Sequence, residues 1–319
     1  MRPGSQLLFT GFVVLVSFFI IQLLASLVVI PIYGFSRVSG MLGGLDFADP
    51  GTVNMLKYFQ VVQSIGLFIV PSLLVAKVLH PQWTSYLYLR KKPSLYNAFW
   101  VIILVIIINP FINFTGDLNA KMHFPSWLSE VEQWMRNAEN AAEKLVKVFL
   151  DVKTGWGLLF NIFMIAILPA LGEELLFRGI IQKLFTKITR NAHWGIWLSA
   201  ALFSALHMQF YGFIPRMLLG AMFGYLLVWS GTLWLPVLAH FINNAGAVIL
   251  LYLIGKGRIS PDIEEFGAGA GGWYYALSSL VMGAVILVVV RQHYRKHRPS
   301  QEDFISGKPN TEISGPEEA

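Results

Sequence analysis

Residues 158–178 read LLFNIFMIAILPALGEELLFR, an apolar run that ends in two glutamates and an arginine. Because a membrane-spanning helix needs about 20 mostly apolar residues, this run predicts a transmembrane helix. An ionised side chain near the bilayer centre costs roughly 2.5–3.5 kcal/mol on insertion scales. Glu173, Glu174 and Arg178 should therefore face the interior of a helical bundle, where such residues usually mark chemistry or transport.

The composition of the whole chain also indicates a membrane protein. Its 319 residues are 55% hydrophobic and only 13% charged, and the mean hydropathy is +0.58. Soluble domains carry about 25% charged residues. The chain has no cysteine, which excludes disulfides, a thiol nucleophile and thiolate metal ligands. The apolar runs predict an all-α fold, a polytopic membrane helical bundle of about eight transmembrane helices. They lie near residues 7–32, 58–78, 98–114, 156–177, 194–209, 213–229, 232–254 and 273–290.

Basic residues orient this bundle. They form three clusters between or after the predicted spans: Arg90, Lys91 and Lys92; Lys183, Lys187 and Arg190; and Arg291, Arg295, Lys296 and Arg298. With eight spans all three clusters fall on one side, which the positive-inside rule makes cytoplasmic. We therefore expect a multi-pass protein of the cell (plasma or inner) membrane with both termini cytoplasmic. Arg216, Lys256 and Arg258 fall on the opposite side and are exceptions.

The chain divides into four predicted segments. Residues 1–154 hold the N-terminal transmembrane helices, and residues 155–254 hold the polar groups described below. Residues 255–298 form an external loop and the last transmembrane helix, and residues 299–319 form a polar, disordered cytoplasmic tail.

The first segment ends in an amphipathic stretch that is too charged to span a membrane. Its apolar residues recur every three or four positions, at Trp127, Val131, Trp134, Ala138, Ala142, Leu145 and Phe149. We expect an external helix that lies on the outer interface or caps the bundle. Farther on, Gly220 and Gly224 form a GxxxG pair, which predicts close helix packing.

The two glutamates have different neighbours on their helix. Glu174 and Arg178 are four residues apart and can form an ion pair. Glu173 points about 100° away, given 3.6 residues per turn, and has no such partner. The plainer interpretation is a structural ion pair beside a second acid that faces water at a helix end.

Two histidines lie in later apolar runs. His207 shares a helix face with Phe203, and His240 shares one with Asn244. Each histidine alone would more simply serve as a hydrogen bond between helices. Together with Glu173 they suggest hydrolysis, with the glutamate as general base on water and one histidine sharing the proton. The other histidine and the asparagine amide would then donate to a developing oxyanion.

A metal site is the alternative use of the same side chains. Glu173, His207 and His240 offer carboxylate and imidazole ligands, which a divalent ion such as Zn²⁺ accepts. No cofactor is certain from the sequence, and the HExxH pattern of zinc proteases is absent.

Two prolines predict a local opening of the helices that carry these groups. Pro169 precedes Glu173 by four residues, and Pro236 precedes His240 by four. Each removes a backbone hydrogen bond, and in a membrane the freed carbonyl needs another partner. The expected depths of His207 and the glutamates in the membrane add a condition to this prediction. For His207 to meet the glutamates, the fourth helix must continue past Arg178, or the fifth must begin before Trp194.

The ordered motifs Glu-Glu-x-x-x-Arg, Phe-x-x-x-His and His-x-x-x-Asn resemble the CPBP family. That family contains type II CAAX prenyl endopeptidases and the bacteriocin-processing or self-immunity proteins also called Abi. The resemblance covers roughly residues 155–250 and implies an eight-helix intramembrane protease fold with a conical cavity. It implies that Glu173 and His207 activate water and that His240 and Asn244 form the oxyanion site. Glu174 and Arg178, together with Phe203, would hold the architecture.

Three functions remain open from the sequence. The first is an intramembrane endopeptidase, metallo- or glutamate-type, whose partners are the lipid bilayer and a membrane-associated protein or peptide, for example of the CAAX type, with no role for nucleic acid. The second is a non-catalytic immunity or scaffold protein of the same family. The third is a proton-coupled transporter that uses Glu173 and the histidines as a relay, against which stands the lack of a visible inverted repeat.

Overall fold

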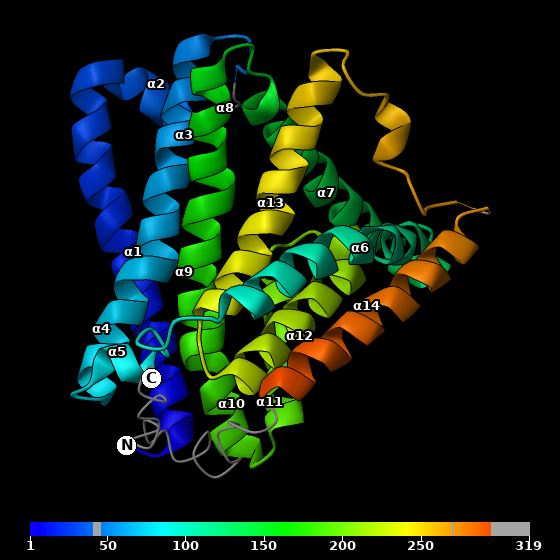
Figure 1. The fold of residues 1–319 in the computed structure, drawn as a ribbon. Coiled ribbons are helices and arrows are strands. Elements are labelled where there is room, and N and C mark those ends of the chain that lie inside the picture. The colour runs from blue at the N-terminus through cyan, green and yellow to red at the C-terminus, as the bar shows by residue number, and fades with distance from the viewer. Residues whose placement is uncertain (41–45, 270, 295–319) are drawn as a thin grey trace.

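The computed structural model describes residues 1–40, 46–269 and 271–294, and over these residues the chain is helical without a β-strand (Figure 1). The α-helices are α1 Pro3–Tyr33, α2 Phe35–Gly40, α3 Pro50–Ser64, α4 Val70–Leu79, α5 Trp83–Tyr86, α6 Leu95–Ala120, α7 Ser129–Leu150, α8 Gly155–Asn161, α9 Leu168–Leu176, α10 Gln182–Thr189, α11 Ala192–Ala205, α12 Phe213–Ser230, α13 Trp234–Gly255 and α14 Trp273–Tyr294. Three π-helical segments, η1 Ile65–Ile69, η3 Ile162–Ile167 and η4 Phe177–Ile181, join neighbouring α-helices, and η2 Ser126–Leu128, η5 Phe210–Gly212 and η6 Pro261–Ile263 are 3₁₀ turns.

Seven helices of the described residues are long and apolar enough to cross a membrane. They are Pro3–Tyr33, Pro50–Leu79, Leu95–Ala120, Gly155–Thr189, Phe210–Ser230, Trp234–Gly255 and Trp273–Tyr294. The predicted all-α, multi-pass membrane bundle is therefore confirmed. The span expected at 194–209 is wrong as drawn, because α11 has 14 residues and the chain turns at its end, where Met208 has φ 56°.

The fourth span is longer than the predicted 156–177. Its helix runs without a break from Gly155 to Thr189, 35 residues that reach about 52 Å at 1.5 Å per residue. The hydrocarbon core of a bilayer is about 30 Å thick. The helix therefore continues well past Arg178, and α11 begins at Ala192, so both ways of bringing His207 level with the glutamates are realised.

Figure 1 shows how these helices are arranged. The helices α1, α3–α4 and α8–α10 stand upright beside one another, while α6, α12 and α14 run obliquely on the other side of α13. In the oblique half α14 packs along α6, and α11 and α12 form an antiparallel hairpin. One apolar core joins α4, α9, α10 and α13 through Val75, Leu175, Leu184 and Val237, and a second joins α6, α12, α13 and α14.

The outward face of α1 is apolar and exposed. Leu8, Phe12, Phe19 and Leu23 are each more than half exposed. Soluble proteins rarely leave so large a contiguous apolar patch uncovered. These side chains are placed to face lipid.

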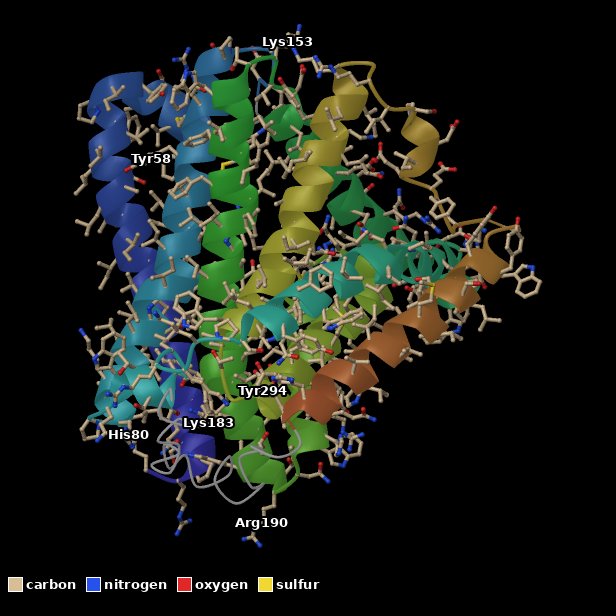
Figure 2. All side chains as sticks on the ribbon, in the orientation of Figure 1. Tyr58, His80, Lys153, Lys183, Arg190 and Tyr294 are labelled. Carbon is tan, nitrogen blue, oxygen red and sulfur yellow. The ribbon has the colours of Figure 1, made fainter. Side chains whose placement is uncertain are left out.

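Basic residues gather at one end of the bundle, as the charge pattern predicts. His80, Lys183, Arg190 and Tyr294 lie toward the same end, and Lys153 lies at the other (Figure 2). Lys183 is not a surface charge, because it is 1% exposed, its ammonium donates to the carbonyl of Tyr86, and it lies over the rings of Tyr86 and Tyr88. Arg295, Lys296, Arg298 and the tail 299–319 lie outside the described residues.

The GxxxG pair on α12 packs as expected. The backbone carbonyl of Gly220 accepts a hydrogen bond from Arg178 Nη2 at 3.1 Å, and that of Gly224 accepts one from Gln182 Nε2 at 3.2 Å. A Cβ added at Gly224 would lie 2.7 Å from Gln182 Oε1 and 2.9 Å from Ile196 Cγ2. Two polar side chains of the fourth span can therefore reach the backbone of α12 only because it carries glycine there.

Replacement of Gly224 by valine should lower the stability of the purified protein. The added atoms would overlap Gln182 and Ile196, and overpacking of this kind typically costs about 1–3 kcal/mol. The same substitution at Gly246, where nothing lies within 4 Å of an added Cβ, is the control. Thermal melting in detergent measures both variants, and equal melting temperatures would contradict the packing argument.

The orientation of the bundle can be tested with single cysteines, because the chain has none of its own. Arg190 and Lys153 are exposed at opposite ends of the molecule. A membrane-impermeant maleimide should label Lys153→Cys in intact cells and Arg190→Cys only after permeabilisation, since basic clusters stay cytoplasmic. The reverse pattern would show that the predicted orientation is wrong.

Candidate active site

A cavity of about 450 Å³ lies among the helices that carry the polar residues. Glu173, His207, His240 and Asn244, the four residues predicted to act together, all line it. The other lining residues are Gln60, Leu145, Val146, Phe149, Ile165, Pro169, Phe203, Gly212, Pro215, Arg216, Leu219, Phe223 and Asn243. The amphipathic helix α7 supplies Leu145, Val146 and Phe149, so it covers the cavity with its apolar face.

Glu174 lies behind the cavity and is fully buried, at 0% exposure. Its Oε1 is 2.9 Å from Arg178 Nη1, the ion pair that the spacing predicts. Arg178 is 1% exposed, and its guanidinium lies 4.8 Å from the ring centroid of Phe203 and 5.5 Å from that of Phe223. The aromatic rings replace water around a cation that could not otherwise stay charged in this place.

His240 joins the two glutamates, which the sequence reasoning missed. Its Nδ1 lies 2.9 Å from Glu174 Oε1, and its Nε2 lies 3.8 Å from Glu173 Oε2. Because a carboxylate paired with an arginine can only accept, Nδ1 carries the proton in this contact. The imidazole is therefore fixed with Nε2 toward Glu173, as a lone pair when neutral and as an N–H donor when protonated. Glu174 thus orients a cavity residue in addition to pairing with Arg178.

His207 lies in the turn after α11 and is exposed to the cavity. Its Nδ1 is 2.8 Å from the carbonyl oxygen of Phe203, a contact in which the nitrogen must donate. A neutral His207 then carries a free lone pair on Nε2. Phe203 packs edge-on against His207, with centroids 4.8 Å apart, and also contacts His240 at 6.1 Å. The ring predicted as support therefore touches both histidines and Arg178.

Asn244 closes the gap that Pro169 leaves in its helix. Pro169 has no N–H for the carbonyl of Ile165 four residues earlier, and Asn244 Nδ2 donates to that carbonyl at 3.0 Å. Asn244 Oδ1 accepts from Asn243 Nδ2 at 3.1 Å. One of the two amide hydrogens of Asn244 remains for a ligand in the cavity. The partner that the freed carbonyl was predicted to need therefore comes from another helix, α13.

Arg216 also lines the cavity, although the sequence reasoning treated it only as an exception to the charge rule. The signal was available, because it is a charged residue inside the apolar run 213–229, as the glutamates are inside theirs. Asn243 was missed as well. Its only signal is that it directly precedes Asn244 on the same helix.

The alternative of a three-ligand metal centre does not fit this arrangement. Among the residues that the structure describes, no three His, Asp or Glu side chains are grouped so that they could hold a metal ion. Glu174 occupies Nδ1 of His240, which leaves only Nε2 of that ring for a ligand in the cavity. We therefore assign no step of the chemistry to a metal.

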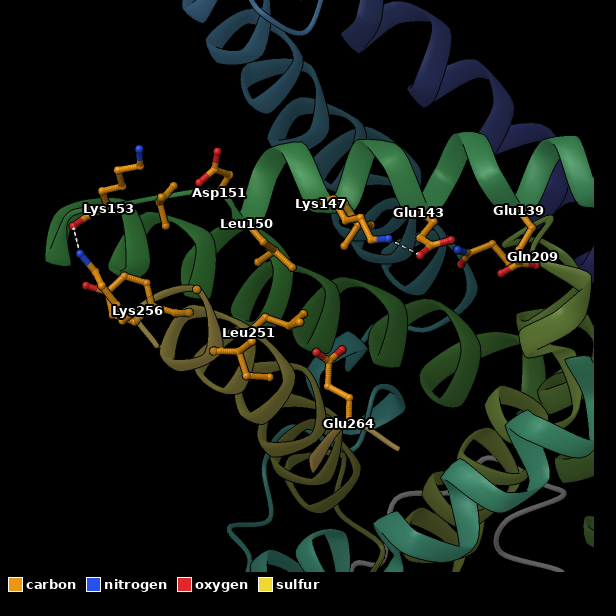
Figure 3. A pocket seen from close by; sticks show the side chains of 15 residues that line it. Glu139, Glu143, Lys147, Leu150, Asp151, Lys153, Gln209, Leu251, Lys256 and Glu264 are labelled. Carbon is orange, nitrogen blue, oxygen red and sulfur yellow. Dashed lines mark hydrogen bonds and ion pairs between the residues drawn. The ribbon is translucent and has the colours of Figure 1, made fainter. Parts of the chain in front are cut away.

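A larger cavity of about 620 Å³ adjoins the first one along α7, where Val146 lines both (Figure 3). Its wall is charged and includes a Lys147–Glu143 ion pair of 2.6 Å, and Lys256 Nζ donates to the carbonyl of Lys153 at 2.8 Å. Gln209 and Glu264 also line it. It contains none of the predicted site residues, so the smaller cavity is the candidate active site.

Comparison with known proteins agrees with the motifs. Residues 155–246 match the family described as "Type II CAAX prenyl endopeptidase Rce1-like", and the match includes every predicted site residue. The resemblance to the CPBP family is therefore confirmed over this segment, and it is a family of CAAX-type intramembrane proteases.

A curated relative matches part of the chain. It is the "Uncharacterized protein YpbD" of Bacillus subtilis (strain 168), which is 33% identical over 89 residues, 27% of this chain and 42% of that protein. The chain thus aligns with less than half the length of this relative. No solved structure matches the chain.

Replacement of Glu174 by glutamine should destabilise the protein. It would leave Arg178 buried without its carboxylate and give His240 a neutral amide oxygen as acceptor, and breaking a buried ion pair in this way costs about 3–5 kcal/mol. Abundance in membranes and thermal melting after purification measure the effect. Glu173→Gln, the same change one residue earlier, is the control and should keep near-normal stability. A Glu174→Gln protein that melts normally but loses activity would instead place Glu174 in the chemistry.

Proposed function

We propose that this chain is an intramembrane endopeptidase that hydrolyses a peptide bond of a membrane-associated protein or peptide. The observation that carries the proposal is that Glu173 faces one cavity with two histidines, one of which is fixed by a buried carboxylate. A structural ion pair would need only Glu174 and Arg178. It would not need a second acid and two imidazoles around a space that can hold a ligand.

Glu173 is the proposed general base. Its carboxylate takes a proton from a water molecule, whose oxygen then attacks the carbonyl carbon of the peptide bond. The lone pair on His207 Nε2 accepts a hydrogen bond from the same water and holds it in place. The proton on Glu173 later passes to the leaving nitrogen as the carbon–nitrogen bond breaks, so the carboxylate is restored.

The oxyanion that forms on the carbonyl oxygen needs donors. Asn244 supplies its remaining amide hydrogen, and His240 supplies Nε2–H when it is protonated. Because Nδ1 of His240 already donates to Glu174, this second donor exists only in the imidazolium form.

Several observations support the protein or peptide class of substrate. The matching family is named for a prenyl endopeptidase, and all of its motif residues are present here. The cavity is lined by apolar side chains of α7 as well as by polar ones, so it suits a peptide that enters from a membrane. A CAAX-type tail is one such substrate.

Replacement of Glu173 by glutamine should abolish turnover while the protein still folds. The amide keeps the shape of the side chain and removes the base, and loss of a general base costs about 10²–10⁴-fold in rate. Comparison of membrane proteomes that contain wild type or Glu173→Gln identifies the cleaved protein, and purified enzyme is then assayed on it.

A matched control accompanies this assay. Glu130→Gln makes the same chemical change at an exposed position of α7 and should leave the rate unchanged. Activity that survives Glu173→Gln would refute the assignment. The same assay with a chelator, followed by added Zn²⁺, tests whether Glu173 and the histidines bind a metal after all.

A further inference from the structure

Arg216 is a cation inside the candidate catalytic cavity. It lies in the first turn of α12, is half-buried, and lines the cavity together with Glu173 and His207. Arg178, the other arginine of this region, lies behind the cavity and does not line it. Arg216 is thus the positive group that a ligand in this cavity would meet.

No carboxylate of the described residues forms an ion pair with Arg216. Its Nη1 donates to the backbone carbonyl of Gln209 at 3.2 Å, and its Nη2 donates to Gln209 Oε1 at 2.8 Å. Both acceptors are neutral. A guanidinium carries five N–H donors, so most of the hydrogen-bonding capacity of Arg216 remains available, although Glu139 and Glu173 are close enough to interact with its charge.

Side chains of α6 and α7 form hydrogen bonds with the backbone of the segment that leads to Arg216. Asn119 of α6 accepts from the backbone N–H of Ile214 at 2.8 Å and donates to the carbonyl of Phe210 at 3.1 Å. Glu139 of α7 accepts from the backbone N–H of Tyr211 at 3.1 Å. These contacts fix the turn between His207 and Arg216, so the cation and the histidine keep a constant position relative to each other.

We propose that Arg216 binds a carboxylate of the substrate and so selects which peptides are placed against Glu173. The inference rests on the proposed function. Arginine presents a planar fork that matches a carboxylate with two parallel hydrogen bonds, and in a poorly hydrated cavity such a pair is strong. The carboxylate can be the free C-terminus of the substrate or an acidic side chain near the cleaved bond, and the two sources are separable by experiment.

A purely structural role for Arg216 makes a different prediction. If the arginine only tethers Gln209, its loss should weaken the binding of every ligand through disorder of the turn. If it binds a carboxylate, its loss should weaken only ligands that carry one. The discriminating quantity is therefore the ratio of affinities for an acid and for its amide.

Three probes that partition into detergent micelles measure this ratio with the purified full chain. They are N-palmitoyl-Leu-Leu-Leu as the free acid, the same peptide as its C-terminal amide, and N-palmitoyl-Leu-Glu-Leu as its C-terminal amide. Dissociation constants follow from ligand-induced thermal shifts, which need no turnover. In the wild type at least one carboxylate probe should bind about 10–100-fold more tightly than the neutral amide, the range expected for hydrogen bonds to a charged group.

Variants of the arginine and of its tether complete the test. Arg216→Gln should reduce the ratio to about one, and Arg216→Lys should keep part of it, because lysine retains the charge without the fork. Gln209→Ala removes the side-chain tether and should leave the ratio unchanged. Preference for the free acid identifies the C-terminus as the source, and preference for the glutamate probe identifies a side chain.

Two results would overturn the inference. One is equal binding of acids and neutral amide by the wild type. The other is an equal loss for all three probes in Arg216→Gln, which is the signature of a tether. A protein that discriminates carboxylates through Arg216 but cleaves no peptide would refute the proposed endopeptidase and leave this binding site intact.

Discussion

The buried carboxylate of Glu174 is the constraint on which the rest of the structure depends. Its Oε1 forms an ion pair with Arg178 and accepts a hydrogen bond from His240 Nδ1, and the side chain is wholly removed from solvent. An ion that is buried so completely is tolerated only when it is paired. The helices that carry these three residues, α9 with η4 and α13, must therefore come together with little freedom. Arg178 also donates a hydrogen bond to the carbonyl of Gly220 on α12 and contacts the ring of Phe203 on α11. These two helices are therefore held close to Glu174 as well.

Irregular backbone surrounds this rigid centre. The helix that carries both glutamates changes to π-helical geometry before them, at Ile162–Ile167, and after them, at Phe177–Ile181. Pro169 lies between the first of these segments and Glu173, and Asn244 accommodates the carbonyl that the proline leaves. Ser199 likewise donates to the carbonyl of Phe177 in the second segment, at 3.2 Å. π-Helical turns are frequent at functional sites. In a membrane they persist only where neighbouring helices supply the missing partners.

Sequence reasoning predicted most of the fold and named four residues that line one cavity, but it did not predict how their side chains are connected. Apolar run length and charge located the spanning helices, because both follow directly from the thickness and polarity of the bilayer. The span predicted at 194–209 extends beyond the end of helix α11, because a run of apolar residues does not show where a turn ends the helix. The pairing of Glu174 with Arg178 is local and could be predicted from spacing. The bond between Glu174 and His240 joins residues 66 positions apart and depends on packing that a single sequence does not encode locally. Arg216 was missed because its charge was used only to judge topology.

The part of the chain that matches known proteins does not build the cavity alone. Gln60, Leu145, Val146 and Phe149 line it from helices that precede residue 155, where the family match begins. Asn119 and Glu139, also from the first half, hold the turn between His207 and Arg216. The residues proposed to act in catalysis therefore come from the matching segment, whereas α3 and α7 complete the lining of the cavity, and α6 and α7 hold the turn that precedes Arg216. Since those helices lie outside the matching segment, changes in them can alter which ligand fits without disturbing Glu174 and its partners.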